Sequence, residues 1–368
     1  MHRARETVLE IDLRALRHNI NHLKSKLTAK TKFMAVVKAY AYGSDSCELA
    51  KYLEELDVYC FAVAYTNEGV ALRKAGIKKP ILVLHPQEVN FNDLTKNHLE
   101  PCLYNFKILN EFIEMANNRA LQHYPVHIKF NTGLNRLGFV EGDIAEIVKK
   151  VKSSSSVKIT SIFSHLTASE DLNEKEFTLS QIEKFKSIVK KTTDTLGYKP
   201  TLHLCNTSGI LNYPEAHFDM VRSGIGMYGF GNSKKENRHL KPIATLKTVI
   251  SQIHTLKKGE SLGYNRGFIS NKTIKTATLP IGHADGIGRQ YGKGKGYVTI
   301  SGKKAPILGN VCMDMIMVNV TDINCTEGDE VIVFGPTHTA EQLAETANTI
   351  SYELITGISQ RVKRVFLE

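Results

Sequence analysis

Eight short apolar segments, separated by turns or by stretches with helical periodicity, dominate residues 33–222 of this 368-residue chain. They span residues 33–38, 60–65, 81–85, 100–104, 126–130, 159–165, 201–206 and 218–222. Short apolar runs of this kind indicate strands, and strands that alternate with helices indicate a parallel sheet covered by helices. Eight such units predict an α/β fold of the (β/α)8 TIM-type barrel class.

An open, doubly wound sheet would also fit this alternation, because strand order cannot be read from the sequence. Sheets of that kind bind dinucleotides through a GxGxxG turn after the first strand. Here the first predicted strand runs into "KAYAYG" (38–43), which lacks that pattern. The barrel is therefore favoured.

The character of the chain changes after the polar run "GFGNSKKENRHLKP" (229–242). The following residues alternate between apolar and polar, are rich in β-branched side chains and contain turn signals such as "KKGE" and "SGKK". This pattern predicts a mainly antiparallel β domain with one helix in "TAEQLAETANT" (339–349). We place the barrel at 11–235 and the β domain at 236–368. We expect a strand in residues 1–10 to join the β domain, and Asp12 to cap the helix that follows.

Polar side chains stand at the ends of the predicted barrel strands, and the packing of an apolar barrel interior does not explain them. They are Lys38, His85, Lys129, His165, Asn206 and Arg222. A single lysine there would usually extend into water. Catalytic groups of such barrels lie at the carboxyl ends of the strands, so several cationic and imidazole groups predict a site for an anionic ligand.

The net charge of +11 and the pI of about 9.2 raise the possibility of a nucleic-acid partner. The lysines are spread along the chain without interleaved aromatic residues, so we expect no nucleic-acid binding. No apolar run approaches the ~20 residues of a membrane span, and the first residues contain no apolar stretch long enough to predict a signal peptide. Six cysteines without CxxC pairing predict neither disulfides nor a metal site. A cytoplasmic enzyme is the expectation.

Several blocks of sequence resemble one family in that family's order. They are "AVVKAYAYG" (35–43), "HIKFNTGLNRLGF" (127–139), "SHLTASE" (164–170), "HLCNTSG" (203–209), "MVRSGIGMYG" (220–229), "LGYNRGF" (262–268), "PIGHADG" (280–286) and "GNVCMDMIMV" (309–318). The family is alanine racemase, whose members use pyridoxal 5'-phosphate (PLP) and combine a barrel with a C-terminal β domain. The resemblance runs nearly from end to end. It implies interconversion of L-alanine and D-alanine, which supplies D-alanine for peptidoglycan.

The resemblance implies a two-base mechanism. Lys38 would bind PLP covalently and act as one acid/base group, and Tyr264 would act as the other on the opposite face. His165 would hydrogen-bond Tyr264 and link it to Arg222. Arg222 would face the pyridine nitrogen, and since an arginine keeps its proton, the cofactor would be a weaker electron sink than with a carboxylate partner.

The remaining site residues are also implied by the resemblance. The cofactor set is Lys38, Tyr42, Asn206, Thr207, Arg222, Gly224, Ile225 and Tyr352. The substrate carboxylate would meet Arg136 and the backbone amide of Met313, and Lys129 matches a lysine that can be carbamylated to orient Arg136. Asp314 matches a supporting position near Tyr264. In the family Tyr264, Met313 and Asp314 come from a second subunit, so we expect a homodimer with shared sites.

Some positions depart from the family pattern and leave the substrate range open. Tyr40 replaces the usual Asn of the lysine motif, His283 replaces a tyrosine and Asn310 replaces an arginine. A broader-specificity racemase acting on serine or lysine is therefore the alternative. Related PLP decarboxylases place a glutamate at the pyridine nitrogen, and single-domain PLP-binding proteins lack the β domain, so both are disfavoured.

Overall fold

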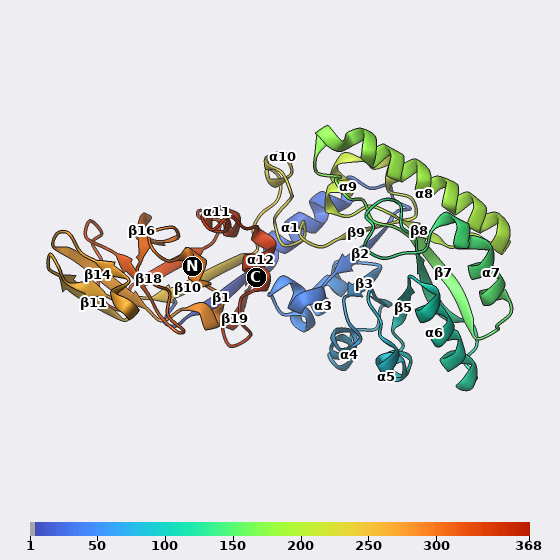
Figure 1. Ribbon diagram of the computed structural model, residues 1–368, viewed down its shortest axis with the longest axis horizontal. Helices are drawn as coiled ribbons and strands as arrows, with labels where there is room; N and C mark the ends of the chain where they lie inside the picture. Colours follow the sequence, from blue (N-terminus) through green and yellow to red (C-terminus); the bar gives the residue numbers. More distant parts are fainter. Residues whose placement is uncertain (1–3) are drawn as a thin grey trace.

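The computed structural model describes residues 4–368, which form a barrel and a β-sheet region arranged along the long axis of the molecule (Figure 1). Eight parallel strands close the barrel, and the last of them, β9, pairs with the first, β2. The strands are β2 (Lys32–Val36), β3 (Cys60–Val63), β4 (Ile81–Val83), β5 (Glu100–Leu103), β6 (Tyr124–Lys129), β7 (Val157–Phe163), β8 (Thr201–His203) and β9 (Met220–Ser223). The predicted barrel is confirmed, and closure excludes the open sheet.

Amphipathic helices surround the barrel because each buries one stripe of apolar side chains against the strands. In α6, for example, the buried positions are Ile108, Leu109, Phe112 and Ala116, which recur at helical spacing. The helices of this part are α1 (Leu13–Lys24), α3 (Ser46–Glu55), α4 (Thr66–Lys74), α5 (Phe91–Lys96), α6 (Phe106–Asn118), α7 (Ile144–Lys152), α8 (Lys175–Leu196) and α9 (Thr207–Asn212). Within residues 4–368, none of the helices has both the length and the apolar character that a membrane span requires.

The β-sheet region is built on one nine-stranded sheet, in the order β11-β14-β17-β16-β15-β18-β10-β1-β19. All neighbours are antiparallel except β1 and β19, which are parallel. The strands are β1 (Val8–Asp12), β10 (Ala244–Val249), β11 (Gln252–Leu256), β14 (Ile274–Leu279), β15 (Tyr297–Ile300), β16 (Lys303–Leu308), β17 (Ile316–Asn319), β18 (Glu330–Phe334) and β19 (Lys363–Leu367). A short pair, β12 (Ser261–Leu262) and β13 (Phe268–Ile269), and the helices α10 (Lys234–Asn237), α11 (Ala340–Glu345) and α12 (Ser351–Thr356) complete this part.

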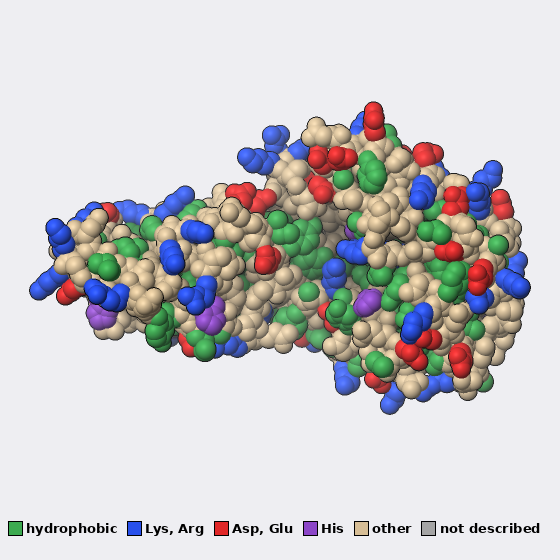
Figure 2. Space-filling view, viewed as in Figure 1, with side chains coloured by type: hydrophobic (Ala, Val, Ile, Leu, Met, Phe, Trp, Pro, Cys, Tyr) green, Lys and Arg blue, Asp and Glu red, His purple; other side chains and the backbone are tan. Residues whose placement is uncertain are grey.

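The N-terminal segment ties the two parts together. Strand β1 lies between β10 and β19 of the sheet, and helix α1 follows it directly on the barrel. The Asp12 side chain accepts a hydrogen bond of 2.9 Å from the backbone amide of Ala15, as expected of an N-cap. Figure 2 shows Lys and Arg side chains scattered over both parts on the face in view, interspersed with Asp and Glu.

Seven of the eight barrel strands end earlier than the sequence predicts, and β9 ends one residue later. Strand β2 ends at Val36, β4 at Val83, β7 at Phe163 and β8 at His203. Lys38, His85, His165 and Asn206 therefore lie in the βα loops just beyond the strands, whereas Lys129 and Arg222 lie within β6 and β9. All six remain at the carboxyl ends of the strands, because these loops begin there.

Candidate active site

A cavity of about 400 Å³ opens at the carboxyl ends of the barrel strands, a volume within the usual range for small-molecule sites. Eleven of the predicted site residues line it: Lys38, Tyr42, Lys129, Arg136, His165, Asn206, Thr207, Arg222, Gly224, Ile225 and Tyr352. Four of these are Lys or Arg, and none of the lining residues is Asp or Glu. The cavity is therefore suited to an anionic ligand.

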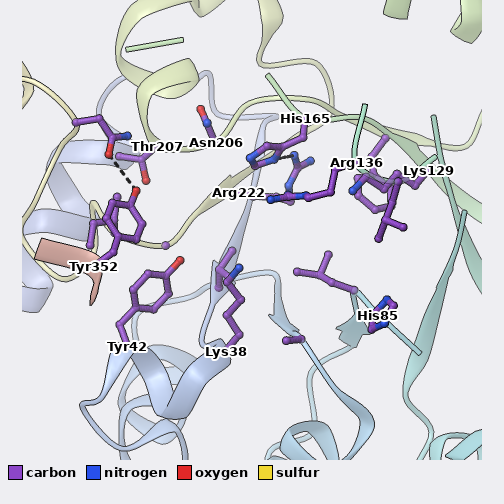
Figure 3. A pocket seen from close by; sticks show the side chains of 18 residues that line it. Lys38, Tyr42, His85, Lys129, Arg136, His165, Asn206, Thr207, Arg222 and Tyr352 are labelled. Atoms are coloured by element: carbon purple, nitrogen blue, oxygen red, sulfur yellow. Dashed lines mark hydrogen bonds between the residues drawn. The ribbon is translucent and has the colours of Figure 1, made fainter. Parts of the chain in front are cut away.

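The cationic and hydroxyl groups are divided between the two ends of the cavity. Figure 3 shows the phenol of Tyr352 and Thr207 at one end, and Lys129 and Arg136 at the other. Lys38 reaches in between them. This distribution suits a ligand with two separate anionic groups.

Lys38 enters the cavity from an unusual turn. It opens α2 (Lys38–Tyr42), and residues 39–42 all have φ between 51° and 56°. Left-handed backbone costs an L-residue about 1–2 kcal/mol, so other contacts must hold four such residues in a row. Glu68 supplies one such contact. One of its carboxylate oxygens accepts from the Ala39 amide at 2.6 Å, and the other accepts from the Ala64 amide at 2.7 Å.

Gly43 closes this turn, also with positive φ, and lies against helix α12. A Cβ atom at Gly43 would stand 2.1 Å from the carbonyl oxygen of Ile355, so only glycine fits. The guanidinium of Arg364 donates to the Gly43 carbonyl at 2.8 Å from Nη2. The C-terminal part of the chain thus fixes the loop that carries Lys38.

The environment of Lys38 favours its neutral amine. Burial lowers the pKa of Lys38, and the positive charge of Arg136 lowers it further, while Glu68 partly opposes this shift. A neutral amine can attack a carbonyl group or accept a proton, which a fully protonated lysine cannot do. A lowered pKa therefore suits Lys38 to the role of nucleophile and base that the sequence predicts for it.

We expect Lys38 to be acetylated at a lower pH than an ordinary lysine in cofactor-free protein, because only the neutral amine reacts. Lys51 is a suitable internal reference, since its hydrogen bond to Glu48 raises its pKa. Competitive labelling with acetic anhydride, followed by peptide mass spectrometry from pH 7 to 11, measures both midpoints. A midpoint for Lys38 at or above that of Lys51 would contradict the assignment.

Arg222 lies at the floor of the cavity, only 5% exposed. Its guanidinium donates to Nδ1 of His203 at 2.6 Å, to Nδ1 of His165 at 3.2 Å and to the carbonyls of Ser164 and Leu204. Burial lowers the pKa of Arg222 to about 10, so it remains charged at neutral pH. The same burial, together with the charge of Arg222, lowers the pKa of both histidines well below their usual value.

Both histidines are therefore neutral hydrogen-bond acceptors toward Arg222. In each ring Nδ1 accepts, so the proton is on Nε2. The predicted link between His165 and Arg222 is present. His203 is a residue whose role the sequence did not reveal, although it stands in the quoted "HLCNTSG" block.

The other end of the cavity offers hydroxyl and amide donors. Burial raises the pKa of Tyr352 to about 12 and also raises that of Tyr42, so both phenols keep their protons. The backbone amides of Gly224 and Ile225 make no hydrogen bond with any residue in the described range 4–368. A Cβ atom at Gly224 would stand 2.2 Å from Oη of Tyr42, which leaves room there only for glycine. Neutral donors around a glycine are typical of a phosphate site.

Asn232 completes this end and was not predicted. Its Oδ1 accepts from the Tyr352 hydroxyl at 3.1 Å, the dashed line in Figure 3. Asn232 lies in the polar run 229–242, which the sequence marks only as the place where the character of the chain changes. No pattern in that run distinguishes Asn232 from its polar neighbours.

Lys129 at the opposite end is a buried cation that forms no ion pair with any carboxylate in residues 4–368. It is 8% exposed, and burial lowers its pKa, as do the charges of Arg136, Arg222 and Lys38. A buried ammonium among three other cations is an unfavourable arrangement, which an anionic ligand or modification would relieve.

Three predicted residues do not line the cavity of their own chain. Tyr264 and Met313 are 75% and 60% exposed, and the side chain of Asp314 pairs with Arg361 at 2.6 Å. Asn310 connects the two loops, since its side-chain amide donates to the Tyr264 carbonyl at 3.1 Å. The structure thus places Tyr264 and Met313 together on the surface of the β-sheet region.

Comparisons with known proteins agree with this arrangement. A family model described as the alanine racemase N-terminal domain matches residues 11–231, and one for the alanine racemase C-terminal domain matches residues 243–366. Alanine racemase of Thermodesulfovibrio yellowstonii is 37% identical over 366 residues, covering 97% of both chains. That of Halothermothrix orenii is 38% identical over 374 residues, covering 98% of this chain and 97% of its own.

Solved structures of alanine racemases share the fold over nearly their full length. The enzyme of Clostridium difficile is 34% identical with a TM-score of 0.93, covering 99% of this chain and 96% of its own. That of Bartonella henselae, described with covalently bound pyridoxal phosphate, is 28% identical with a TM-score of 0.89, covering 98% and 99%. The chain therefore belongs to the alanine racemase family, isomerases that interconvert L-alanine and D-alanine.

Proposed function

We propose that this protein is a PLP-dependent alanine racemase that uses Lys38 and Tyr264 as its two acid/base groups. The observation that carries the proposal is the cavity itself. It brings Lys38, whose pKa is lowered, together with the buried cation Arg222 and with separate groups of anion-binding side chains at its two ends.

The residues of the cavity fit PLP. Tyr42, Tyr352, Thr207 and the amides of Gly224 and Ile225 would hold the phosphate, because they supply neutral donors. Asn206 borders the same end. Arg222 would donate to the pyridine nitrogen, and Lys38 would bind the cofactor covalently. When bound, PLP withdraws electrons from the α-carbon of an amino acid and so acidifies its α-proton.

The cationic end of the cavity would bind the substrate. Arg136 would pair with the substrate carboxylate, and the backbone amide of Met313 from the partner subunit would complete that site. We propose that Lys129 is carbamylated, which turns its cation into an anion that orients Arg136. The lowered pKa of Lys129 supports this, because carbamylation requires a neutral amine.

Racemisation requires proton transfer on both faces of the α-carbon. Lys38 would serve one face, and Tyr264 of the partner subunit the other. Since Nδ1 of His165 accepts from Arg222, its Nε2–H is left to donate to the oxygen of that phenol and so orient it. Asp314 of the partner subunit would support Tyr264. The protein would act as a cytoplasmic homodimer that supplies D-alanine for peptidoglycan.

The test is reconstitution with PLP followed by assays on several amino acids. We expect a yellow protein with one PLP per chain, and borohydride should fix the cofactor on Lys38, with Lys129 as the internal control in the same cavity. Alanine should be racemised faster than serine or lysine. A protein that takes up no PLP would contradict the proposal, and faster turnover of serine or lysine would support the broader-specificity alternative.

A further inference from the structure

A chain of hydrogen-bonded side chains crosses the barrel interior below Arg222. Nδ1 of His203 lies 2.6 Å from the Arg222 guanidinium, and its Nε2 lies 3.0 Å from Oγ of Ser161. Oγ of Ser161 lies 2.5 Å from Nδ1 of His127, and Nε2 of His127 lies 2.6 Å from Oε2 of Glu100. The five residues come one from each of the neighbouring strands β9, β8, β7, β6 and β5.

The first half of this chain has a fixed direction. A guanidinium only donates, so Nδ1 of His203 must accept. Burial and the charge of Arg222 lower the pKa of His203 well below its usual value, so the ring is neutral and carries its proton on Nε2. Oγ of Ser161 therefore accepts from His203.

The second half follows from the buried hydroxyl of Ser161, which is 1% exposed. Among residues 4–368, Nδ1 of His127 is the one acceptor within reach of its O–H. A buried hydroxyl without a partner is costly, so Ser161 donates to His127. The remaining ring proton of His127, on Nε2, then points at Glu100. Every donor points from the cation toward the carboxylate, and aligned hydrogen bonds strengthen one another.

Glu100 lies at the far end of the hydrogen-bonded chain, where it is partly exposed. Its side chain is 19% exposed and borders a second cavity, of about 140 Å³, that also touches His127 and Ser161. Among residues 4–368, Arg222 has no carboxylate as a hydrogen-bond partner, although an unpaired buried cation is costly. The titratable groups that face it are His165, His203, Lys129 and the thiols of Cys102 and Cys205. A carboxylate directly beside Arg222 would repel an anionic ligand in the first cavity, the one lined by Lys38 and Arg222, which we call the upper cavity.

We propose that His203, Ser161, His127 and Glu100 are positioning residues that hold Arg222 charged and directed into the upper cavity, with Glu100 as its remote countercharge. We name this set the barrel relay. The proposal rests on the proposed function, because it assumes that Arg222 faces the pyridine nitrogen of the cofactor. No proton has to travel along the relay, because its effect is electrostatic and orientational.

The first test observes the relay without turnover. Nitrogen-15 spectra of histidine-labelled holoenzyme, with His127 and His203 assigned by single substitution to Asn, report which ring nitrogen carries the proton. We expect each ring to carry a single proton, on Nε2, at pH 7.5. A doubly protonated His127 at pH 7.5, or either residue with its proton on Nδ1, would overturn the proposed direction.

The second test breaks the relay at Ser161, with Ser156 as its matched control. Ser156 is also a buried serine near the start of β7, and its hydroxyl bonds Ser154 outside the relay. We expect Ser161→Ala to lower kcat/KM for alanine about fivefold or more, with KM within about twofold. The alkaline limb of the pH profile should move down by at least about half a pH unit, since the variant breaks the hydrogen bonds that couple Arg222 to Glu100, whose charge itself remains. Ser156→Ala should change neither quantity.

Glu100→Gln provides a second variant that keeps the hydrogen bond from His127 and removes only the charge. It should produce the same downward shift of the alkaline limb. The relay proposal would be wrong if the alkaline limb of the pH profile were unchanged in both variants. This conclusion requires that their PLP content and melting temperature stay close to the wild type. If wild-type holoenzyme racemised no amino acid, the proposed function would fail instead, while the nitrogen-15 spectra would still decide the geometry.

Discussion

Tyr264→Phe should lower kcat/KM for alanine racemisation at least about a hundredfold, equivalent to about 2.7 kcal/mol of lost transition-state stabilisation. The loss must be equal in both directions, because the two enantiomers have equal free energies. The substitution removes only the phenolic oxygen. Tyr264 lines no part of its own cavity, so PLP binding should be unaffected.

The two faces of the α-carbon can be separated by hydrogen exchange. In D2O the variant should still exchange the α-proton of the enantiomer served by Lys38, and exchange of the other enantiomer should be almost lost. Nuclear magnetic resonance of each alanine enantiomer measures both rates. Equal exchange of both enantiomers, or near-normal racemisation, would exclude Tyr264 as a base.

Tyr297→Phe is the control for this substitution. Tyr297 lies in the same β-sheet region, and its hydroxyl forms no hydrogen bond with any side chain or backbone group in the described part of the chain. Its ring stacks on His338, which the Phe variant preserves. Activity within about twofold of the wild type is expected, because surface substitutions that spare packing have small effects.

The barrel was predictable because its eight apolar segments are separated by helical patterns of the right length. The ends of the strands were harder to predict, since the sequence does not mark where strand pairing stops and a loop begins. Lys38 was assigned to the end of a strand, whereas the structure places it in a left-handed turn. Four consecutive L-residues in that conformation oppose every local preference, and distant contacts from Glu68 and α12 hold them.

Charged groups at strand ends predicted an anion site, and the structure gathers them in one cavity. The roles of the individual residues stay predictions. The barrel relay could not be foreseen, because Glu100 and Ser161 resemble ordinary strand residues until the strands are placed side by side. His127 and Ser161 are direct neighbours in the register of β6 and β7, although they are far apart in sequence.

The largest effect is expected from mixing two inactive variants. Lys38→Ala lacks the proposed cofactor lysine, and Tyr264→Ala lacks the proposed second base. If sites are shared, a heterodimer of these chains has one doubly damaged site and one intact site. With random exchange half of the dimers are heterodimers, so about a quarter of all sites should be intact. Activity should therefore rise from near zero to about a quarter of the wild-type value.

The exposed position of Tyr264 and Met313 on the β-sheet region is the structural reason for this expectation. Tyr264 and Met313 stand at the surface, and neither lines the cavity of the same chain. A two-fold dimer uses each surface twice, so both sites would form together. Tyr352 differs from these residues, since it reaches the cavity of its own chain.

The complementation assay tests this account most directly. Lys38→Ala and Tyr264→Ala proteins are mixed in equal amounts under conditions that exchange subunits, and exchange is verified by native mass spectrometry with one variant isotopically labelled. The account predicts recovery of racemase activity that follows the growth of the heterodimer peak. A heterodimer peak without any recovered activity would contradict it, because sites built within single chains cannot complement each other.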